Sequence, residues 1–109
     1  MSGQVVREVH SWMETDNAAA GAASAARAAP AGGLRHFITS ISASFSSTQA
    51  GALLTLEEGT STEVGRWYVY DGFTITFASP IAVTPGIQAH ADLAAGTGTG
   101  AVTMTGFTL

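Results

Sequence analysis

The sequence contains no cysteine, and this absence removes three kinds of chemistry. Without thiols the chain has no disulfide framework, no thiolate metal centre and no thiol nucleophile. Its fold must therefore come from burying apolar side chains. A chain of 109 residues is long enough for one domain with a hydrophobic core and too short for two.

Lysine is absent as well, and the few cations stand singly, at Arg7, Arg27, Arg35 and Arg66. The net charge is −4, and charged residues make up 11% of the chain, less than half of the roughly 25% of an average domain. Nucleic-acid-binding proteins cluster Lys and Arg on one face, so we expect no nucleic-acid partner. A surface with so few charges favours a protein that is largely covered by its neighbours.

The sequence also lacks a long apolar run. The most apolar stretch, residues 18–31, is interrupted by Gly21, Ser24, Arg27 and Pro30, whereas a membrane-spanning helix needs about 20 apolar residues. Polar residues alternate through positions 1–12, so we expect no signal peptide. With 46% hydrophobic residues the chain is predicted to fold as a soluble protein without a membrane partner.

What the sequence does have is period-two alternation, which is clearest from residue 36 onward. Residues 36–45 predict a long strand with Phe37, Ile41 and Phe45 on one face. Further strands are predicted at 52–57, 63–70, 73–77, 81–84, 87–93 and 101–109. The expected core consists of Phe37, Ile41, Phe45, Leu54, Leu56, Phe73, Ile75, Phe77, Ile87 and Leu93.

Turn residues separate the predicted strands. Asp71-Gly72 favours a tight hairpin, and Ser79-Pro80 ends a strand or marks an edge strand, because proline cannot donate to the ladder. Gly106 is expected to shift the phase of the last strand, as a bulge does.

Seven to nine short strands with regular turns predict an all-β chain folded as a single antiparallel β-sandwich or jelly roll. We expect residues 34–109 to form this domain and residues 1–33 to form an extended N-terminal arm. The alanines of residues 18–29 are also compatible with a helix capped by Thr15 or Asp16. Such a helix would bury little apolar area, so the extended conformation is favoured while both stay open.

The residues that carry chemistry are sparse. His10, His36 and His90 show no metal-ligand spacing. His90 and Asp92 share a strand face at i and i+2, and they would hold a metal only with help from another strand; a polar pair facing solvent or a neighbour is favoured. No Gly-x-Ser-x-Gly elbow surrounds a serine, and the loop 96–100 lacks the Lys-Ser/Thr ending of a phosphate-binding loop. We therefore predict no enzyme, no catalytic residue, no metal and no cofactor.

One aromatic cluster indicates a contact surface. Along the strand at 63–70, Trp67 and Val69 share one face. Tyr68 and Tyr70 share the other, and one of the two pairs must face away from the core. Exposed aromatic side chains favour a subunit interface or a sugar-stacking surface. Together with apolar residues of the arm, the candidate interface residues are Val5, Val6, Val9, Trp12, Tyr68 and Tyr70.

The order of elements from residue 36 onward resembles the small β-sandwich accessory proteins of tailed-phage virions. The resemblance rests on the strand at 36–45, Leu54-Thr-Leu56 before an acidic-Gly turn, Trp67-Tyr-Val69, the run 75–81 followed by Thr84-Pro-Gly86, and Gly106-Phe107. These motifs are patterns of alternation and turns rather than chemical signatures. The N-terminal third is similar to the more variable arm of such proteins.

The resemblance implies a structural virion protein made in the host cytoplasm, most specifically a capsid decoration (cement) protein. It further implies a homotrimer whose partners are its own copies and the major capsid protein or another virion protein. The arm would then clamp a neighbour, and deleting residues 1–33 would leave a folded domain that no longer attaches. The alternative is a receptor- or carbohydrate-binding module at a tail or fibre tip, which would use Tyr68 and Tyr70.

Overall fold

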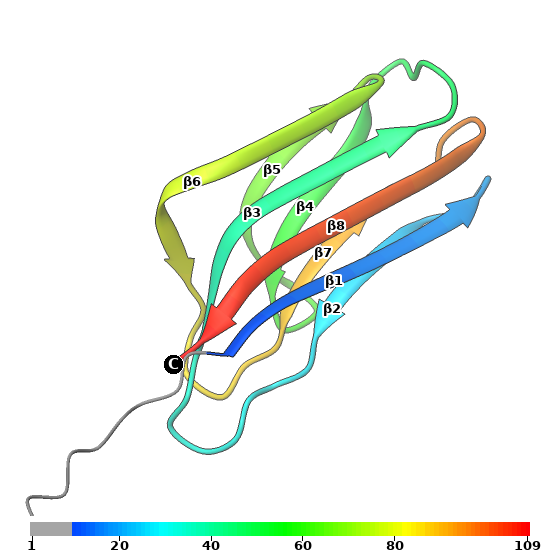
Figure 1. Cartoon of the computed structure of the whole chain (residues 1–109). Coiled ribbons are helices and arrows are strands. Elements are labelled where there is room, and N and C mark those ends of the chain that lie inside the picture. The colour runs from blue at the N-terminus through cyan, green and yellow to red at the C-terminus, as the bar shows by residue number, and fades with distance from the viewer. Residues whose placement is uncertain (1–9) are drawn as a thin grey trace, which may run out of the picture.

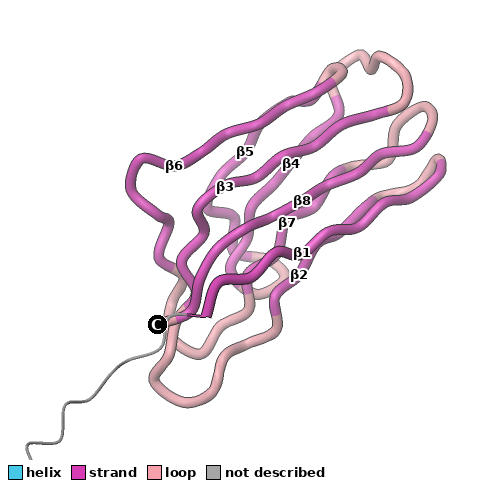
Figure 2. The backbone as a smooth tube through the Cα atoms, viewed as in Figure 1, coloured by secondary structure: helices cyan, strands magenta, loops and turns pink. Residues whose placement is uncertain are grey.

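The computed structural model describes residues 10–109, which form strands joined by loops and turns (Figure 2). No helix occurs among these residues, so none is long and apolar enough to cross a membrane. The eight strands are β1 (His10–Ala19), β2 (Ala23–Arg27), β3 (His36–Phe45), β4 (Ala52–Glu58), β5 (Thr62–Val69), β6 (Gly72–Ala82), β7 (Ala89–Leu93) and β8 (Thr99–Thr108). The predicted all-β class is confirmed.

The strands make two four-stranded antiparallel sheets that pack face to face (Figure 1). Their orders are β1-β8-β3-β6 and β2-β7-β4-β5. Strand β1 pairs with β8, β2 with β7, β3 with β6 and β4 with β5, so the first half of the chain runs antiparallel to the second half. Apart from β4 and β5, successive strands lie in different sheets, which is the wrapping of an eight-stranded jelly roll.

Alternation along each strand builds the core between the sheets. Every second residue of β4, β7 and β8 faces inward, as does that of β3 on either side of one bulge. Complete burial of one Leu, Ile or Met side chain stabilises the fold by about 1.5–3 kcal/mol. The largest fully buried apolar side chains are Ile38, Ile41, Leu54, Leu56, Leu93, Met104, Val69, Val83 and Val102. On β7 the inward residues Ala89 and Ala91 are small and completely buried.

The expected position of Phe37 in the core is wrong. A bulge at Thr39 lies between the Ile38–Gly106 and Ser40–Thr105 pairs, so the alternation of β3 changes phase. Ile38 is buried in place of Phe37, which is half-buried and stacks on Phe107 at 5.0 Å between ring centroids. Ile87 is likewise not in the core, because β7 begins only at Ala89 and the Ile87 side chain is 37% exposed.

The expected bulge at Gly106 is wrong for a related reason. Strand β8 keeps its register with β1 throughout, and Gly106 faces the core beneath the indole of Trp12. A Cβ atom at Gly106 would lie 2.6 Å from Cζ2 of Trp12 and 2.3 Å from the carbonyl oxygen of Phe37. Gly106 therefore makes room for the indole of Trp12. The bulged residue is Thr39, which lies on the neighbouring strand β3.

Asp71-Gly72 does not close a hairpin, contrary to expectation. It is a corner at which the chain leaves β5 in one sheet and enters β6 in the other. The backbone N–H of Phe45 donates to the carbonyl of Asp71 at 2.9 Å, which holds this corner against the end of β3. An Asp-Gly pair indicates a tight turn but does not determine which strands pair. Pro80 lies in β6, an edge strand as expected.

Residues 10–27 belong to the sandwich, so the expected arm of residues 1–33 is wrong for this part of the chain. Residues 10–19 form β1 and residues 23–27 form β2, one in each sheet. The alanine-rich segment is extended at β2, where Ala23 and Ala25 are completely buried against the opposite sheet. Small side chains suit this position because β1 and β2 lie close together there (Figure 1).

Candidate functional site

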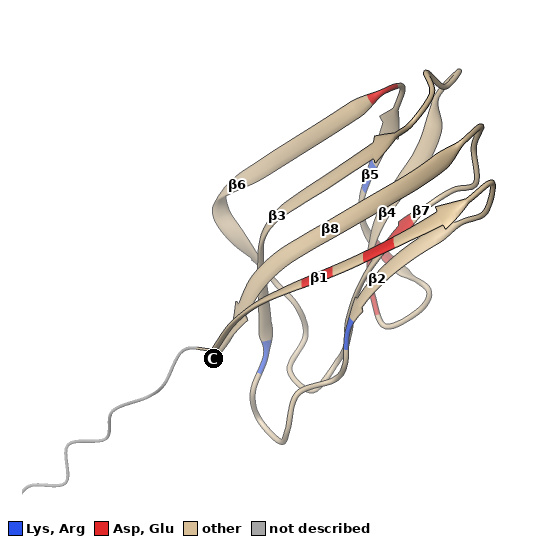
Figure 3. Ribbon diagram, turned by 45° about the vertical axis from the view of Figure 1, so that its right-hand side comes forward, with Lys and Arg blue, Asp and Glu red and all other residues tan. Residues whose placement is uncertain are grey.

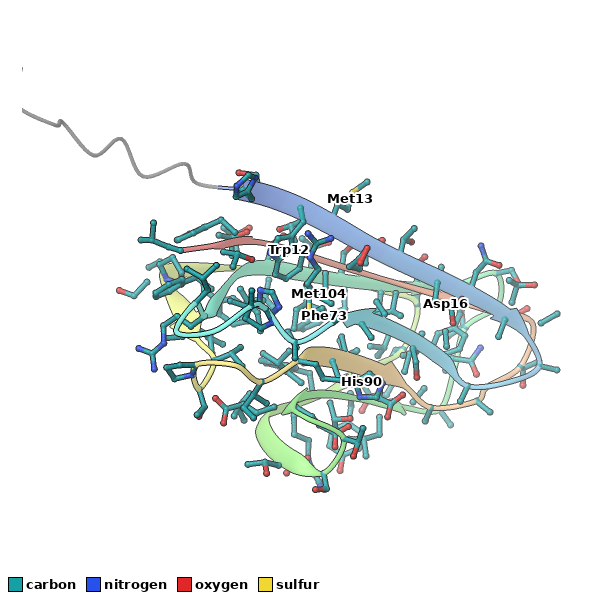
Figure 4. The ribbon with its side chains drawn as sticks, turned by 90° about the horizontal axis from the view of Figure 1, so that it is seen from below. Trp12, Met13, Asp16, Phe73, His90 and Met104 are labelled. Carbon is teal, nitrogen blue, oxygen red and sulfur yellow. The ribbon has the colours of Figure 1, made fainter. Side chains whose placement is uncertain are left out.

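Trp12 is a core residue and not an interface residue, which corrects the sequence prediction. Its side chain is 8% exposed and points between the two layers, whereas the neighbouring Met13 projects away from the molecule (Figure 4). Its Nε1–H donates to Oγ1 of Thr108 at 3.1 Å. The other predicted arm residues, Val5, Val6 and Val9, lie outside the described residues.

A buried chain of hydrogen bonds continues from Trp12 to His36. Nε2 of His36 lies 2.7 Å from the carbonyl oxygen of Ala28 and must donate to it, because a carbonyl only accepts. In the neutral ring Nδ1 then accepts from the hydroxyl of Thr108, at 2.7 Å. Both ring nitrogens of His36 take part in hydrogen bonds, so this histidine stabilises the packing of the chain here and is not a metal ligand.

Tyr68 and Tyr70 lie on the outside, as expected for one of the two pairs. Their side chains are 55% and 58% exposed, while Trp67 and Val69 pack toward the core. The ring of Tyr70 lies over Gly51, where an added Cβ would contact it at 3.4 Å. The two tyrosines therefore present an aromatic surface that is available to another molecule.

The outer face of the sheet β1-β8-β3-β6 carries no charge. Strands β3, β6 and β8 contain no Asp, Glu, Lys or Arg, and the acidic residues of this sheet lie on β1 (Figure 3). The side chains of Glu14 and Asp16 reach toward β2, where they contact Arg27 and the backbone N–H of Ser24. We call this surface the hydroxyl face, defined by Thr15, Thr39, Ser40, Ser42, Ser44, Thr74, Thr76, Thr103 and Thr105. The local sequence does not show that these strands lie side by side, because strand order is not encoded locally.

Hydroxyl groups on this face bond to one another across strands. Thr15 and Thr103 approach at 3.1 Å between hydroxyl oxygens, and Thr105 approaches Thr39 at 2.8 Å and Ser40 at 2.5 Å. Because such hydroxyls already have partners, covering the face costs less than covering unpaired polar groups.

One end of the hydroxyl face is apolar. Phe37 and Phe107 stack there, and Met13 is 65% exposed. A shallow hollow of about 440 Å³ lies at the other end, lined by Ser44, Gly72 and neighbouring residues. One surface thus carries an apolar patch at one end, hydroxyl groups along its middle and a shallow hollow at the other end.

Three ionisable residues meet on the outer face of the other sheet. In the β4–β7 register Glu57 lies opposite His90, and Asp92 follows two residues later on the same face of β7. Oε1 of Glu57 lies 3.5 Å from Nδ1 of His90, and Oδ1 of Asp92 lies 3.8 Å from Nε2. The sequence paired His90 with Asp92 but missed Glu57, because β4 reaches β7 only in the folded chain.

Ser24 of β2 completes this cluster without creating a nucleophile. Its hydroxyl donates to Oδ1 of Asp92. A serine is activated when its hydroxyl donates to a basic histidine nitrogen, with a carboxylate behind the ring. Here the order is serine, carboxylate, histidine, so the arrangement does not prepare Ser24 for acyl transfer.

No protein-family model matches the chain, and no curated protein is significantly similar to it in sequence. A relation to virion proteins stays a prediction from the pattern of strands and turns in the sequence.

Proposed function

We propose that this protein is a non-enzymatic structural module that assembles with its own copies into a larger symmetric particle, most specifically as a trimeric capsid decoration protein of a tailed-phage virion. The observation that carries the proposal is the uncharged hydroxyl face. The chain has a net charge of −4, so copies repel one another over most of their surface. A contact made through the hydroxyl face places no like charges opposite each other.

The size of this face explains why many contacts would be needed. Neighbouring strands lie about 4.8 Å apart and rise about 3.4 Å per residue, so four strands of about eight residues cover roughly 500 Å². A stable interface buries about 800 Å² on each partner. One such contact is weak, and a lattice of repeated contacts gains strength by avidity.

Edge strands give a second reason for assembly. The sheets end at β1 and β6 in one layer and at β2 and β5 in the other, and the outer edge of each leaves backbone groups unpaired. Closed symmetry covers such edges and limits open-ended aggregation. The jelly roll occurs in viral capsid and lectin domains alike, so the fold is compatible with this function but does not assign it.

The native mass of the purified chain, measured by light scattering at several concentrations, tests the assembly. We expect a mass of three chains for the wild type, and a lower mass for Thr103→Arg, which puts a charge in the centre of the hydroxyl face. Thr62→Arg adds the same charge on the exposed part of β5 and serves as the control. A monomer at every concentration would contradict the proposal. Co-sedimentation with capsids that lack the protein then tests the decoration role.

A second candidate is a receptor- or carbohydrate-binding module at a tail or fibre tip, favoured by the exposure of Tyr68 and Tyr70. Stacking of sugar rings on tyrosine faces would supply the affinity. A glycan array with the wild type and a Tyr68→Ala/Tyr70→Ala variant tests it. Binding that the variant loses would support this candidate, and an array without any signal would count against it.

A further inference from the structure

The cluster of Glu57, His90 and Asp92 has the dimensions of a metal site. One ligand-type atom from each residue lies within 4.8 Å of the other two. Zinc binds histidine nitrogen and carboxylate oxygen at about 2.0–2.2 Å, which places the ligands of a tetrahedral ion about 3.3 Å apart. The observed 3.5 Å between Glu57 Oε1 and Nδ1 of His90 is close to this spacing, and Asp92 Oδ1 lies 3.8 Å from the other ring nitrogen, Nε2.

The charges of the cluster call for a cation. The Glu57 side chain is only 12% exposed, and among the described residues it has no hydrogen bond and no arginine partner. A carboxylate removed from water is costly unless a positive charge compensates it. Arg66 on the adjacent strand does not serve this purpose, because its guanidinium binds Glu63 at 2.8 Å. That hydrogen bond raises the pKa of Arg66 above its usual range.

His90 lacks a hydrogen-bond partner on the side that faces Glu57. Its side chain is 15% exposed, and its Nδ1 atom is buried without a hydrogen bond. Buried polar atoms of native proteins normally have a partner, and an exception calls for an explanation such as an ion. Nδ1 faces the Glu57 carboxylate, so an ion between them would satisfy both groups.

We infer that Glu57, His90 and Asp92 form a binding site for a divalent first-row transition-metal ion of the Zn²⁺ class, with one ring nitrogen of His90 as the nitrogen ligand. One imidazole and two carboxylates, without sulfur, suit Zn²⁺, Co²⁺ or Ni²⁺. Ca²⁺ and Mg²⁺ prefer six or more oxygen ligands, and three side chains with one nitrogen serve them poorly.

The strands hold the ligands in place before the ion binds. Backbone pairing fixes β4 beside β7, and the hydroxyl of Ser24 orients the Asp92 carboxylate from β2. Asp92 is 39% exposed and lines a hollow of about 230 Å³ with Leu53 and Thr55. Solvent therefore reaches Asp92 on this side, where water or a group from another molecule can complete the coordination shell.

Titration of the untagged full chain with Zn²⁺, followed by calorimetry, tests this site. We expect one ion per chain, and at least a tenfold loss of affinity in each of His90→Gln, Glu57→Gln and Asp92→Asn. Mg²⁺ at the same concentrations should not compete. His10→Gln, which removes a histidine at the exposed start of β1, is the matched control and should bind as the wild type does.

Three outcomes would overturn the inference: no Zn²⁺ binding at millimolar concentration, wild-type affinity in His90→Gln, or equal competition by Mg²⁺. Should the variants fail to fold, the wild type alone decides through its histidine NMR signals. Zn²⁺ that shifts the His90 ring while those of His10 and His36 stay unchanged supports the site. Zn²⁺ that shifts only the His10 ring refutes it.

Discussion

Replacing Trp12 with alanine tests whether the start of the described chain is part of the core. The indole is 8% exposed and fills the space above Gly106. Truncation of a buried Trp typically costs about 3–5 kcal/mol, because apolar contacts are lost and a cavity remains. The Thr108 hydroxyl also loses the N–H that donates to it. We therefore expect a loss near the upper end of this range.

A loss of this size is large compared with the total stability of such a domain, which is about 5–15 kcal/mol. Each 1 kcal/mol lowers Tm by about 4–8 °C in a domain of this size, so Trp12→Ala should unfold at least about 12 °C below the wild type. Thermal unfolding followed by circular dichroism measures the difference. Urea unfolding then gives the change in free energy directly.

Two variants separate the causes of this loss. Met13→Ala alters the adjacent residue, which is 65% exposed, and should change the stability by less than about 0.5 kcal/mol. Trp12→Phe keeps most of the apolar area but removes the N–H donor, so its loss should be smaller than that of Trp12→Ala. If Trp12→Ala and Met13→Ala both unfold at the wild-type temperature, residues 10–19 act as a detachable arm and the packing of Trp12 in the core is wrong.

Three further results are expected. Deletion of residues 1–33 should abolish folding, because it removes one strand from each sheet; a folded truncated chain in circular dichroism would contradict this. Gly106→Ala should destabilise the fold severely in urea, since its Cβ would lie 2.3 Å from the Phe37 carbonyl oxygen, whereas Gly32→Ala has open space and should be neutral. Thr108→Val should cost about 1–3 kcal/mol in the same assay, because it leaves an indole N–H and an imidazole nitrogen in the core without a partner.

Much of the fold is visible in the sequence because alternation is a local property of a strand. Side chains point to opposite faces in turn, so inward residues such as Ile41, Leu54 and Leu93 could be predicted from their spacing alone. The same rule places Tyr68 and Trp67 on opposite faces of their strand. Two of the three residues of the candidate metal site followed in this way, since His90 and Asp92 had to share a face.

Features that depend on contacts distant in sequence were decided only by the tertiary structure. The bulge at Thr39 shows this, because it lies between the Ile38–Gly106 and Ser40–Thr105 pairs of β3 with β8, a register that the local pattern of β3 does not record. Glu57 reaches His90 only because the jelly roll pairs β4 with β7. The sequence by itself determined which residues alternate, and the topology determined which strands lie side by side, because strand pairing is a choice among many distant partners that no local pattern records.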